Sequence, residues 1–459
     1  MKRFQVADLA RIIKAESIET TATFTGVSTD SRTIGPGQCF FAIKGENFDG
    51  VVFLAGAFAK GAVCAVVNKD VNTEEFADKT ILKVNDSLQA LGDFARWYRQ
   101  KGEFKVIAIT GSVGKTTTRN IISHVLSRRY QVHQAPKNFN TLTGLPLSIL
   151  AADSDDQILV LELGTNHPGE IAALTRIAIP DIALITNIHP SHLEGFGSLE
   201  NIAEEKAAIS EGLKEEGLLI INADCRALVN ACRQKDLDFV TFGKSAVTDF
   251  YAENIQYKDL SSTFAINGTG IYLPLPGSGA VENTIAAWSV CSRLGIRVED
   301  FAEAVKAVRP VSMRAELLRI GTLTVLDDCY NANPASMENA LDILSNLSRN
   351  KKRRSVFICG DMAELGEDAE KLHQELGCCV AKANVRLLLA VGQLAGLTAE
   401  AAGKNADYDL EIKFFDDALS ACNKLADYIK DYDIILVKGS RAMKLETVVE
   451  KLKDLFGPA

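Results

Sequence analysis

The sequence predicts an α/β protein of three domains. These are a small N-terminal α/β domain, a central domain with a doubly wound, mostly parallel sheet, and a C-terminal Rossmann-like α/β domain. The chain has 459 residues, too many for one hydrophobic core, because single cores stop growing near ~250–300 residues. Apolar residues make up 47% and charged residues 24%, as in globular proteins and unlike disordered or collagen-like chains. Apolar β-branched runs alternate with helical patterns, which favours βαβ units.

The first domain is expected over residues 1–102. Two strand-like segments, GVSTDSR and CFFAI, precede a helix-like segment, VVFLAGAFAKG. A third strand-like segment, AVCAVV, leads to an amphipathic helix from Ser87 to Arg99. These few short elements indicate a small α/β unit.

The central domain is expected over residues 103–311. Its runs KVIAITGS, ILVLELG, IALITNI and GLLIIN alternate with helical patterns, and continuous apolar runs are typical of parallel strands buried on both faces. Beyond Asp249, the shorter segments FYAENIQY, STFAING and GIYLPLP predict antiparallel strands at the sheet edge. A linker is expected at Pro310, because proline disfavours helix in the residue before it.

The third domain is expected over residues 312–459. Four strand-like runs, TLTVLDD, SVFICGD, RLLLAVG and DIILVKG, are each followed by a loop and a helical stretch. This rhythm predicts a second parallel sheet covered by helices.

The net charge and the cysteines limit which partners and which cellular compartment we expect. The formal charge is -9, so no broad basic surface for nucleic acid is expected. Ten cysteines occur without a C-x-x-C pair, which favours reduced thiols. The N-terminus does not read as a signal peptide, and no run approaches the ~20 apolar residues of a membrane span. We expect a cytoplasmic monomer without a membrane span.

One segment combines a buried strand, a glycine-containing turn and a helix. Backbone N–H groups in such a turn cradle phosphates, the lysine offsets phosphate charge, and the first threonine after it binds Mg²⁺. Ile109 stands where the general pattern has its first glycine, and a chance turn is the alternative. The segment is Thr110, Gly111, Ser112, Val113, Gly114, Lys115, Thr116 and Thr117.

Acidic and basic side chains follow the next predicted strands. Glu162 ends the run ILVLELG, and a carboxylate there faces the crevice where nucleotides bind in open sheets. His189 and His192 follow IALITNI, and Lys206 lies on the next predicted helix. A buried or capping glutamate and hydrogen-bonded structural histidines are the alternatives. Together, Thr116, Glu162 and His192 indicate phosphoryl transfer from a nucleotide with two Mg²⁺ ions.

Several segments together resemble the Mur ligase family, the ATP-dependent amide-bond-forming enzymes of peptidoglycan synthesis. TGSVGKTT matches the family's form of the phosphate loop, including its missing first glycine. The resemblance covers nearly the whole chain, and its further segments are typical of the branch that adds D-alanyl-D-alanine to UDP-N-acetylmuramoyl-tripeptide. These are TDSR, FFAIKGENFDG, NFNTLTGLP, ELGTNHPGEI, HLEGFGSLENIAEEK, DDCYNANPASM, GDMAELG and VKGSRAMKLE.

The resemblance implies roles around ATP. Lys115 would bind the β/γ-phosphates and Thr116 a Mg²⁺ ion, while Glu162 and His192 would hold metal ions. Lys206 matches a lysine that CO₂ carbamylates in several members, an ordinary surface lysine being the alternative. Arg314 would reach the γ-phosphate with a planar, fixed charge. The residues placed around the nucleotide are Asn138, Asn140, Asn283, Asp328, Asn331 and Asn333.

The resemblance also implies two further sites. A D-alanyl-D-alanine site would include Lys438, Ser440 and Arg441, the last pairing with the dipeptide carboxylate. The second site would bind the uridine diphosphate end of the substrate, and it includes the TDSR segment, for which a simple polar turn is the alternative. Its residues would be Ser28, Asp30, Ser31, Arg32, Gly45, Asn47 and Asp49.

The chain departs from the family pattern at three places. Gly279-Ala280 stands where a His-Asn pair is usual, Met313 where glycine often precedes the bridging arginine, and Val51 where a histidine often follows Phe-Asp-Gly. These departures concern nucleotide affinity and first-domain contacts, and they leave Lys115, Glu162, His192 and Lys206 in place.

The implied reaction joins D-alanyl-D-alanine to the tripeptide through an acyl phosphate, with ATP as co-substrate. The domains should close around this labile intermediate, with hinges near Lys101 and Pro310. Three alternatives stay open: another amide ligase of the family, a nucleotide-binding regulatory protein, and a P-loop kinase.

Overall fold

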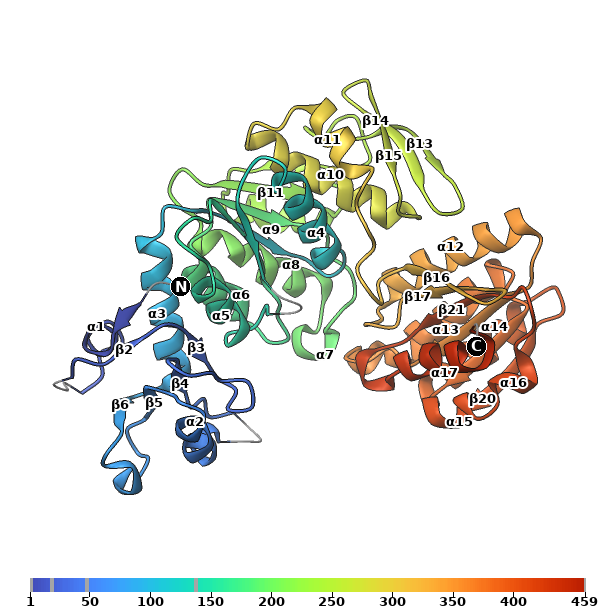
Figure 1. Ribbon diagram of the computed structural model, residues 1–459. Coiled ribbons are helices and arrows are strands. Elements are labelled where there is room, and N and C mark those ends of the chain that lie inside the picture. Colours follow the sequence, from blue (N-terminus) through green and yellow to red (C-terminus); the bar gives the residue numbers. More distant parts are fainter. Residues whose placement is uncertain (1–2, 17–19, 46–48, 136–138, 458–459) are drawn as a thin grey trace.

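The computed structural model describes residues 3–16, 20–45, 49–135 and 139–457. Three regions follow one another along the chain, and each contains its own sheets (Figure 1). The predicted α/β class with three sheet-bearing regions is confirmed. Within the described residues, no helix is long and apolar enough to cross a membrane.

The first region holds a small parallel sheet of order β3-β4-β5-β6 and a separate antiparallel pair, β1-β2. The three predicted strands correspond to β3, β4 and β5 and the two predicted helices to α2 and α3, whereas β1, β2, β6 and α1 were not predicted. The strands are β1 (Phe4–Gln5), β2 (Thr23–Phe24), β3 (Val27–Ser28), β4 (Cys39–Phe41), β5 (Cys64–Asn68) and β6 (Thr80–Val84). The helices are α1 (Val6–Ile12), the 3₁₀ helix η1 (Gly50–Phe53), α2 (Leu54–Ala59), η2 (Glu74–Phe76) and α3 (Ser87–Lys101).

The central region is built on a six-stranded parallel sheet of order β12-β11-β10-β7-β9-β8. Because β9 and β10 lie on opposite sides of β7, their carboxyl ends flank the point where the chain order reverses, the usual ligand position in such sheets. The strands are β7 (Lys105–Thr110), β8 (Val132–Gln134), β9 (Ile158–Glu162), β10 (Ile182–Ile185), β11 (Leu218–Asn222) and β12 (Val240–Phe242). The helices are α4 (Lys115–Leu126), α5 (Gly144–Leu150), α6 (Glu170–Ala178), α7 (Leu193–Phe196), α8 (Leu199–Ala207), η3 (Ala208–Gly212) and α9 (Arg226–Gln234).

Three antiparallel strands follow, as predicted, but they form a sheet of their own and do not extend the edge of the central one. They are β13 (Glu253–Tyr257), β14 (Ser262–Ile266) and β15 (Thr269–Leu273). The expected edge position is wrong because α10 (Ser278–Arg293) and α11 (Val298–Val305) pack beside these strands and share their apolar core.

The C-terminal region contains a mixed six-stranded sheet of order β16-β17-β21-β18-β19-β20, with only β16 antiparallel. Four of the strands were predicted, and the two edge strands β16 and β20 were not. The strands are β16 (Glu316–Ile320), β17 (Leu323–Asp327), β18 (Ser355–Gly360), β19 (Leu387–Val391), β20 (Glu411–Phe415) and β21 (Ile434–Lys438). The helices are α12 (Pro334–Lys351), η4 (Gly366–Asp368), α13 (Ala369–Lys382), α14 (Gln393–Asn405), α15 (Ala418–Cys422), α16 (Leu425–Tyr428), η5 (Arg441–Met443) and α17 (Glu446–Phe456).

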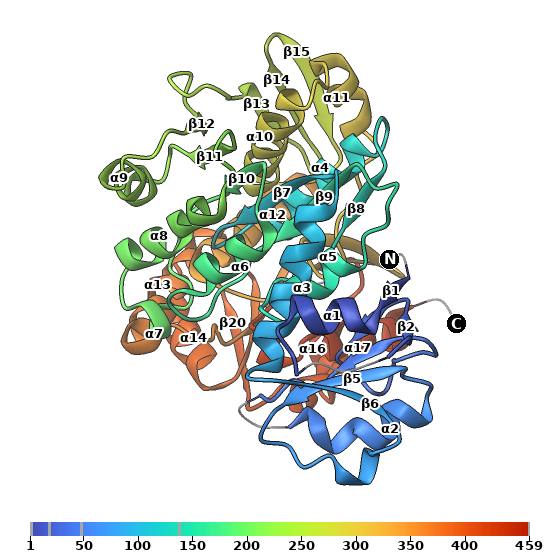
Figure 2. The same cartoon turned by 90° about the vertical axis from the view of Figure 1, so that its left-hand side faces the viewer.

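One hydrophobic core joins the first region to the central one. Helix α3 packs against α5 and α6, and the three lie side by side in both views (Figure 2). The shared core runs from Phe24 and Phe94 in the first region to Leu145 and Ile171 in the central one. The C-terminal region has two separate cores, one on each face of its sheet. The first two regions therefore form one packed body, to which the third is attached.

Candidate functional site

A cleft of about 820 Å³ lies between the central and C-terminal regions. The carboxyl ends of the central strands and the loops after β17, β18 and β21 line it. Because it is formed by both regions, a molecule bound there would touch each of them. The sequence-predicted residues that line it are Ser112 to Thr117, Asn140, Glu162, His192, Asn283, Arg314, Asp328, Asn331, Asn333, Lys438, Ser440 and Arg441.

The phosphate loop lies directly between β7 and α4, as expected. Gly111 and Gly114 have φ values of 144° and 86°, which side-chain-bearing residues rarely adopt. A Cβ on Gly111 would lie 1.9 Å from Thr186 Oγ1, and one on Gly114 would lie 2.1 Å from Asn283 Oδ1. Both positions therefore require glycine for conformation and for space.

The segment Thr186 to His189, which follows β10, supports this loop through hydrogen bonds, and the sequence reasoning singled out only His189 of it. Asn187 Oδ1 accepts a hydrogen bond from the Val113 N–H at 2.9 Å, and Thr186 Oγ1 donates to the Val113 carbonyl at 2.6 Å. Ser112 Oγ donates to the His189 carbonyl at 3.0 Å. The signal available was the same as for Glu162, polar residues at the carboxyl end of a buried strand.

Glu162 lies at the end of β9 and is 2% exposed. Thr116 Oγ1 donates a hydrogen bond to Glu162 Oε2 at 3.1 Å, and Arg119 Nη1 lies 3.0 Å from Glu162 Oε1. A hydroxyl and a carboxylate oxygen are ligands that Mg²⁺ prefers, so this pair suits a magnesium ion beside the phosphate loop. Arg119, which the sequence reasoning did not single out, offsets the charge of the buried carboxylate.

Two lysines at the site have lowered pKa values. Burial lowers the pKa of Lys115 to about 8, with nearby Glu162 opposing the shift and Arg314 adding to it. The Lys115 ammonium donates to the Gly111 carbonyl at 2.5 Å. Burial also lowers the pKa of Lys206 to about 7, and the charge of Lys115 adds to that effect. Because Lys206 is only 2% exposed, the alternative of an ordinary surface lysine is wrong.

His192 contacts the C-terminal region and not Glu162. Its Nδ1 pairs with the Glu364 carboxylate, and this contact lowers the pKa of Glu364. His192 has a φ of 54° at the start of α7. Among the described residues, no three His, Cys, Asp or Glu side chains are grouped so that they could hold a metal ion. The predicted set of Thr116, Glu162 and His192 is therefore only partly assembled.

On the C-terminal side, Arg314 and Arg441 both approach the ring of Tyr330. The distances from their Cζ atoms to the ring centre are 4.2 Å and 6.0 Å. Lys438, expected at the dipeptide, is 1% exposed and its Nζ lies 2.6 Å from Asp328 Oδ2. Asp328, expected near the ribose, is therefore paired with Lys438 in this structure.

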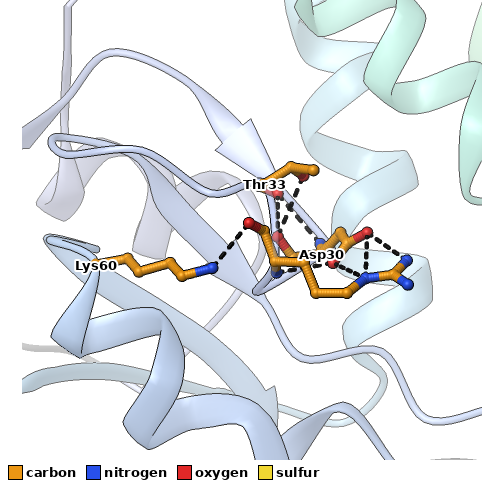
Figure 3. Close-up of polar contacts among 5 residues, drawn as sticks. Asp30, Thr33 and Lys60 are labelled. Carbon is orange, nitrogen blue, oxygen red and sulfur yellow. Dashed lines mark hydrogen bonds and ion pairs between the residues drawn. The ribbon is translucent and has the colours of Figure 1, made fainter.

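In the polar turn predicted to bind the uridine end, the charged side chains contact each other (Figure 3). Arg32 Nη2 lies 2.7 Å from Asp30 Oδ2, and this contact lowers the pKa of Asp30 to about 2. Lys60 Nζ donates to the Arg32 carbonyl at 2.8 Å, which adds a cation that the sequence reasoning missed.

Other predicted residues around this turn have mainly local contacts. Ser28 Oγ accepts from the Asp30 N–H at 3.1 Å, and Asp49 Oδ1 accepts from the Val51 N–H at 3.0 Å. Ser31 and Gly45 lie in the same two loops. Asn47 and, on the nucleotide side, Asn138 lie outside the described residues.

Three family models match the chain in order. The model described as "Mur ligase family, catalytic domain" matches residues 23–99, the Mur ligase middle domain matches 109–291, and the Mur ligase glutamate ligase domain matches 313–441. The UDP-N-acetylmuramoyl-tripeptide--D-alanyl-D-alanine ligase of Bacillus subtilis is 36% identical over 433 residues, which cover 93% of each chain. The chain belongs to the Mur ligase family. The Escherichia coli ligase of the same name is 32% identical, with 98% of each chain covered.

Solved Mur ligases share the fold over nearly the full length. A MurF crystal structure from Acinetobacter baumannii matches with a TM-score of 0.89 and 29% identity, covering 99% of both chains. The MurF ligase from Thermotoga maritima, solved in complex with ADP, matches with a TM-score of 0.80 and 28% identity, covering 94% of this chain and 97% of that one.

The structure shows how the chain accommodates two departures from the family pattern. Met313, where Mur ligases often have glycine, has a left-handed φ of 58°, so the backbone keeps a glycine-like turn without glycine. The Gly279 N–H donates to Asn339 Oδ1 of α12 at 3.1 Å. Asn339 thus fills part of the cleft wall where the His-Asn pair is missing.

Proposed function

We propose that this Mur ligase joins D-alanyl-D-alanine to UDP-N-acetylmuramoyl-tripeptide with ATP, giving the UDP-muramoyl-pentapeptide, ADP and phosphate. The observation that carries the proposal is near full-length similarity to ligases named for this reaction. The cleft supports it, because it has a phosphate loop on the central side and two arginines on the C-terminal side.

The ATP phosphates bind at the loop from Gly111 to Thr116. The N-terminus of α4 presents backbone N–H groups there, and Lys115 supplies a positive charge. Asn283 lies against Gly114, and Thr118 Oγ1 donates to Asn283 Oδ1 at 3.3 Å. Adenosine would extend toward Asn283, Asn331 and Asn333, which line the same cleft. A Thermotoga relative solved with ADP is consistent with this use of the cleft.

Magnesium would be held by Thr116 and Glu162, with His192 and a carbamylated Lys206 as ligands of a second ion. Bound there, Mg²⁺ would neutralise charge on the transferring phosphoryl group. The structure suits the carbamate, because only a neutral amine reacts with CO₂ and the Lys206 pKa is lowered to about 7. Within the described residues, no hydrogen bond or ion pair holds the Lys206 amine, so it is free to react.

In the first step, the terminal carboxylate of the tripeptide attacks the ATP γ-phosphorus, giving an acyl phosphate and ADP. Lys115 and Arg314 lie where they can offset charge on the phosphoryl oxygens. In the second step, the dipeptide amine attacks the acyl carbon and phosphate leaves, while Arg441 binds the dipeptide carboxylate. Closure of the two regions around the cleft would exclude water from the acyl phosphate.

The uridine diphosphate end would bind in the first domain, at the turn of Asp30 and Arg32 and at the loop from Gly45 to Asp49. We assign residues 1–102 to this end, 103–311 to ATP and metals, and 312–459 to the dipeptide. Since one chain carries all three sites, a monomer suffices for the reaction. Because ATP is a co-substrate and the ten cysteines are free thiols, we place the enzyme in the cytoplasm.

The test is phosphate release with ATP and UDP-N-acetylmuramoyl-tripeptide, with and without D-alanyl-D-alanine, and mass spectrometry of the product. We expect release that depends on the dipeptide, together with a product heavier than the tripeptide by the dipeptide minus water. Release without that dependence, or a phosphorylated stable product, would refute the assignment. For the carbamate, Lys206→Ala should lose activity, and full activity in this variant contradicts it.

A further inference from the structure

The backbone on both sides of Arg314 is tied to the loop after β17. The Tyr330 N–H donates to the Met313 carbonyl at 3.2 Å, and the Ala315 N–H donates to Asp328 Oδ1 at 3.0 Å. Met313 and Ala315 both have positive φ values, 58° and 49°. Two such residues around one arginine fix the direction in which its side chain leaves the chain.

The same loop is anchored from a third segment. Lys438, at the end of β21, donates to Asp328 Oδ2 at 2.6 Å and to the Asn331 carbonyl at 3.0 Å. Lys438 is buried, so this contact is shielded from solvent. The position of the Tyr330 backbone is therefore determined from both sides, by Met313 and by Lys438 through Asn331.

The ring of Tyr330 is the shared contact of two cations from distant parts of the chain. Arg314 comes from the linker region and stacks closely, with its Cζ 4.2 Å from the ring centre. Arg441 follows β21 and lies at 6.0 Å, while its Nη1 contacts Glu446 Oε1 at 3.0 Å. Guanidinium groups are attracted to aromatic faces at such distances.

We propose that Tyr330 is a positioning residue that holds Arg314 and Arg441 in a fixed relation on the C-terminal side of the cleft. The Tyr330 ring then sets the distance between the two arginines before Arg314 binds the γ-phosphate and Arg441 binds the dipeptide carboxylate. This inference rests on the proposed function, since it takes the ligands of both arginines from it. The ring acts through the arginines and needs no contact with either substrate.

The test compares KM values for three substrates in purified full-length variants. Tyr330→Leu removes the aromatic face, and we expect the KM of ATP and the KM of D-alanyl-D-alanine each to rise roughly two- to fivefold, the usual size of such a contact at partly exposed sites. Tyr330→Phe keeps the face and should restore both. The KM of the UDP-substrate should not change, since its proposed site lies in the first domain.

A matched control is Tyr432, whose ring pairs with Arg353 at 5.2 Å on the surface and is not part of the cleft lining. Tyr432→Leu removes a comparable cation–aromatic contact and should leave all three KM values unchanged. If Tyr330→Leu does not fold, pentafluorophenylalanine at position 330 keeps the ring shape but reverses the charge of its face, and it should raise the same two KM values.

Unchanged KM values in Tyr330→Leu or in the fluorinated protein would overturn the inference. So would equal defects in Tyr330→Phe and Tyr330→Leu, or a rise in only one of the two KM values. The proposed function is tested separately by dipeptide-dependent turnover of the wild-type enzyme. If that turnover is present and Tyr330 has no effect, only the role of Tyr330 fails.

Discussion

Lys206 combines burial with a titratable amine, which couples the stability of the central domain to pH. Its pKa is about 7 when folded and about 10.5 in an exposed chain. Between these values the unfolded chain binds more protons, so this group makes the folded state more stable as pH rises from about 7 to 10.5.

Lys206→Met should therefore raise the free energy of unfolding at pH 7, by up to about 4 kcal/mol, since one pKa unit is worth about 1.4 kcal/mol. The gain should shrink toward pH 10. Urea denaturation in CO₂-free buffer at several pH values measures this. A variant with the same pH slope as wild type would show that the amine is not desolvated.

The backbone conformation of Met313 leads to a prediction about stability. A non-glycine residue in the left-handed region is strained by about 1 kcal/mol or more, and glycine recovers part of this despite its greater flexibility when unfolded. Met313→Gly should raise the melting temperature of the C-terminal domain by about 2 °C in calorimetry. Ser312→Gly, at an exposed neighbour with negative φ, should not raise it, and an equal rise would contradict the strain argument.

Residues that belong to a local pattern were predictable from the sequence, and residues defined by a distant partner were not. Lys115 and Thr116 follow from the strand–turn–helix pattern, and Glu162 from its place at a strand end. Arg119 carries no such signal, because only the fold shows that its side of α4 faces Glu162. Lys438 lies at the end of a strand as expected, yet its ammonium group pairs with Asp328, a partner 110 residues away in the sequence.

At the level of elements, α3 is the connection that fixes the first domain. Its Arg99 is 2% exposed, and its Nη2 lies 2.7 Å from Asp181 Oδ2 of the central domain. Arg99 also donates to the carbonyls of Ala178 and Phe104. These contacts fasten the end of α3 just before Lys101, so the hinge expected near Lys101 has little freedom.

Arg99→Ala should destabilise the protein by about 3 kcal/mol, because the carbonyls of Ala178 and Phe104 lose a buried donor and Asp181 keeps only Lys214 as a paired cation. Arg96→Ala on the exposed face of the same helix should change stability by less than about 0.5 kcal/mol. Chemical denaturation of both variants measures the difference. Equal effects would mean that the pair contributes nothing beyond helix propensity.

The prediction of elements failed at sheet edges. The apolar runs of β7, β9, β18 and β21 indicate strands buried on both faces, whereas β16 and β20 carry charged and exposed positions that hide the pattern. The small sheet after β12 was recognised as antiparallel, but its separation from the main sheet depends on packing with α11.

For the whole molecule, motion should occur at the linker near Pro310. The C-terminal domain has its own cores, and it meets the central domain through polar contacts such as Asn350 Nδ2 to Asp259 Oδ1 at 2.6 Å. Polar contacts of this kind are easily exchanged with water. Domain closure over the acyl phosphate is therefore expected to pivot here.

A disulfide across this interface should arrest that motion. With Asp259→Cys and Asn350→Cys combined, oxidation should lower kcat at least about tenfold and reduction should restore it, because closure and opening are part of each turnover. Each single cysteine variant under the same oxidation is the control. An oxidised double variant with wild-type kcat would show that the reaction proceeds without movement of the two domains.

The core shared by the first two domains also bears on how the chain is made. The first domain leaves the ribosome before the segments from Leu145 to Ile209 that cover its apolar side. At ~5–20 residues per second, about 100 further residues take roughly 5–20 s to synthesise. During that interval the face of α3 that later packs against α5 and α6 is open to water on a newborn chain, so this stage of synthesis is exposed to aggregation.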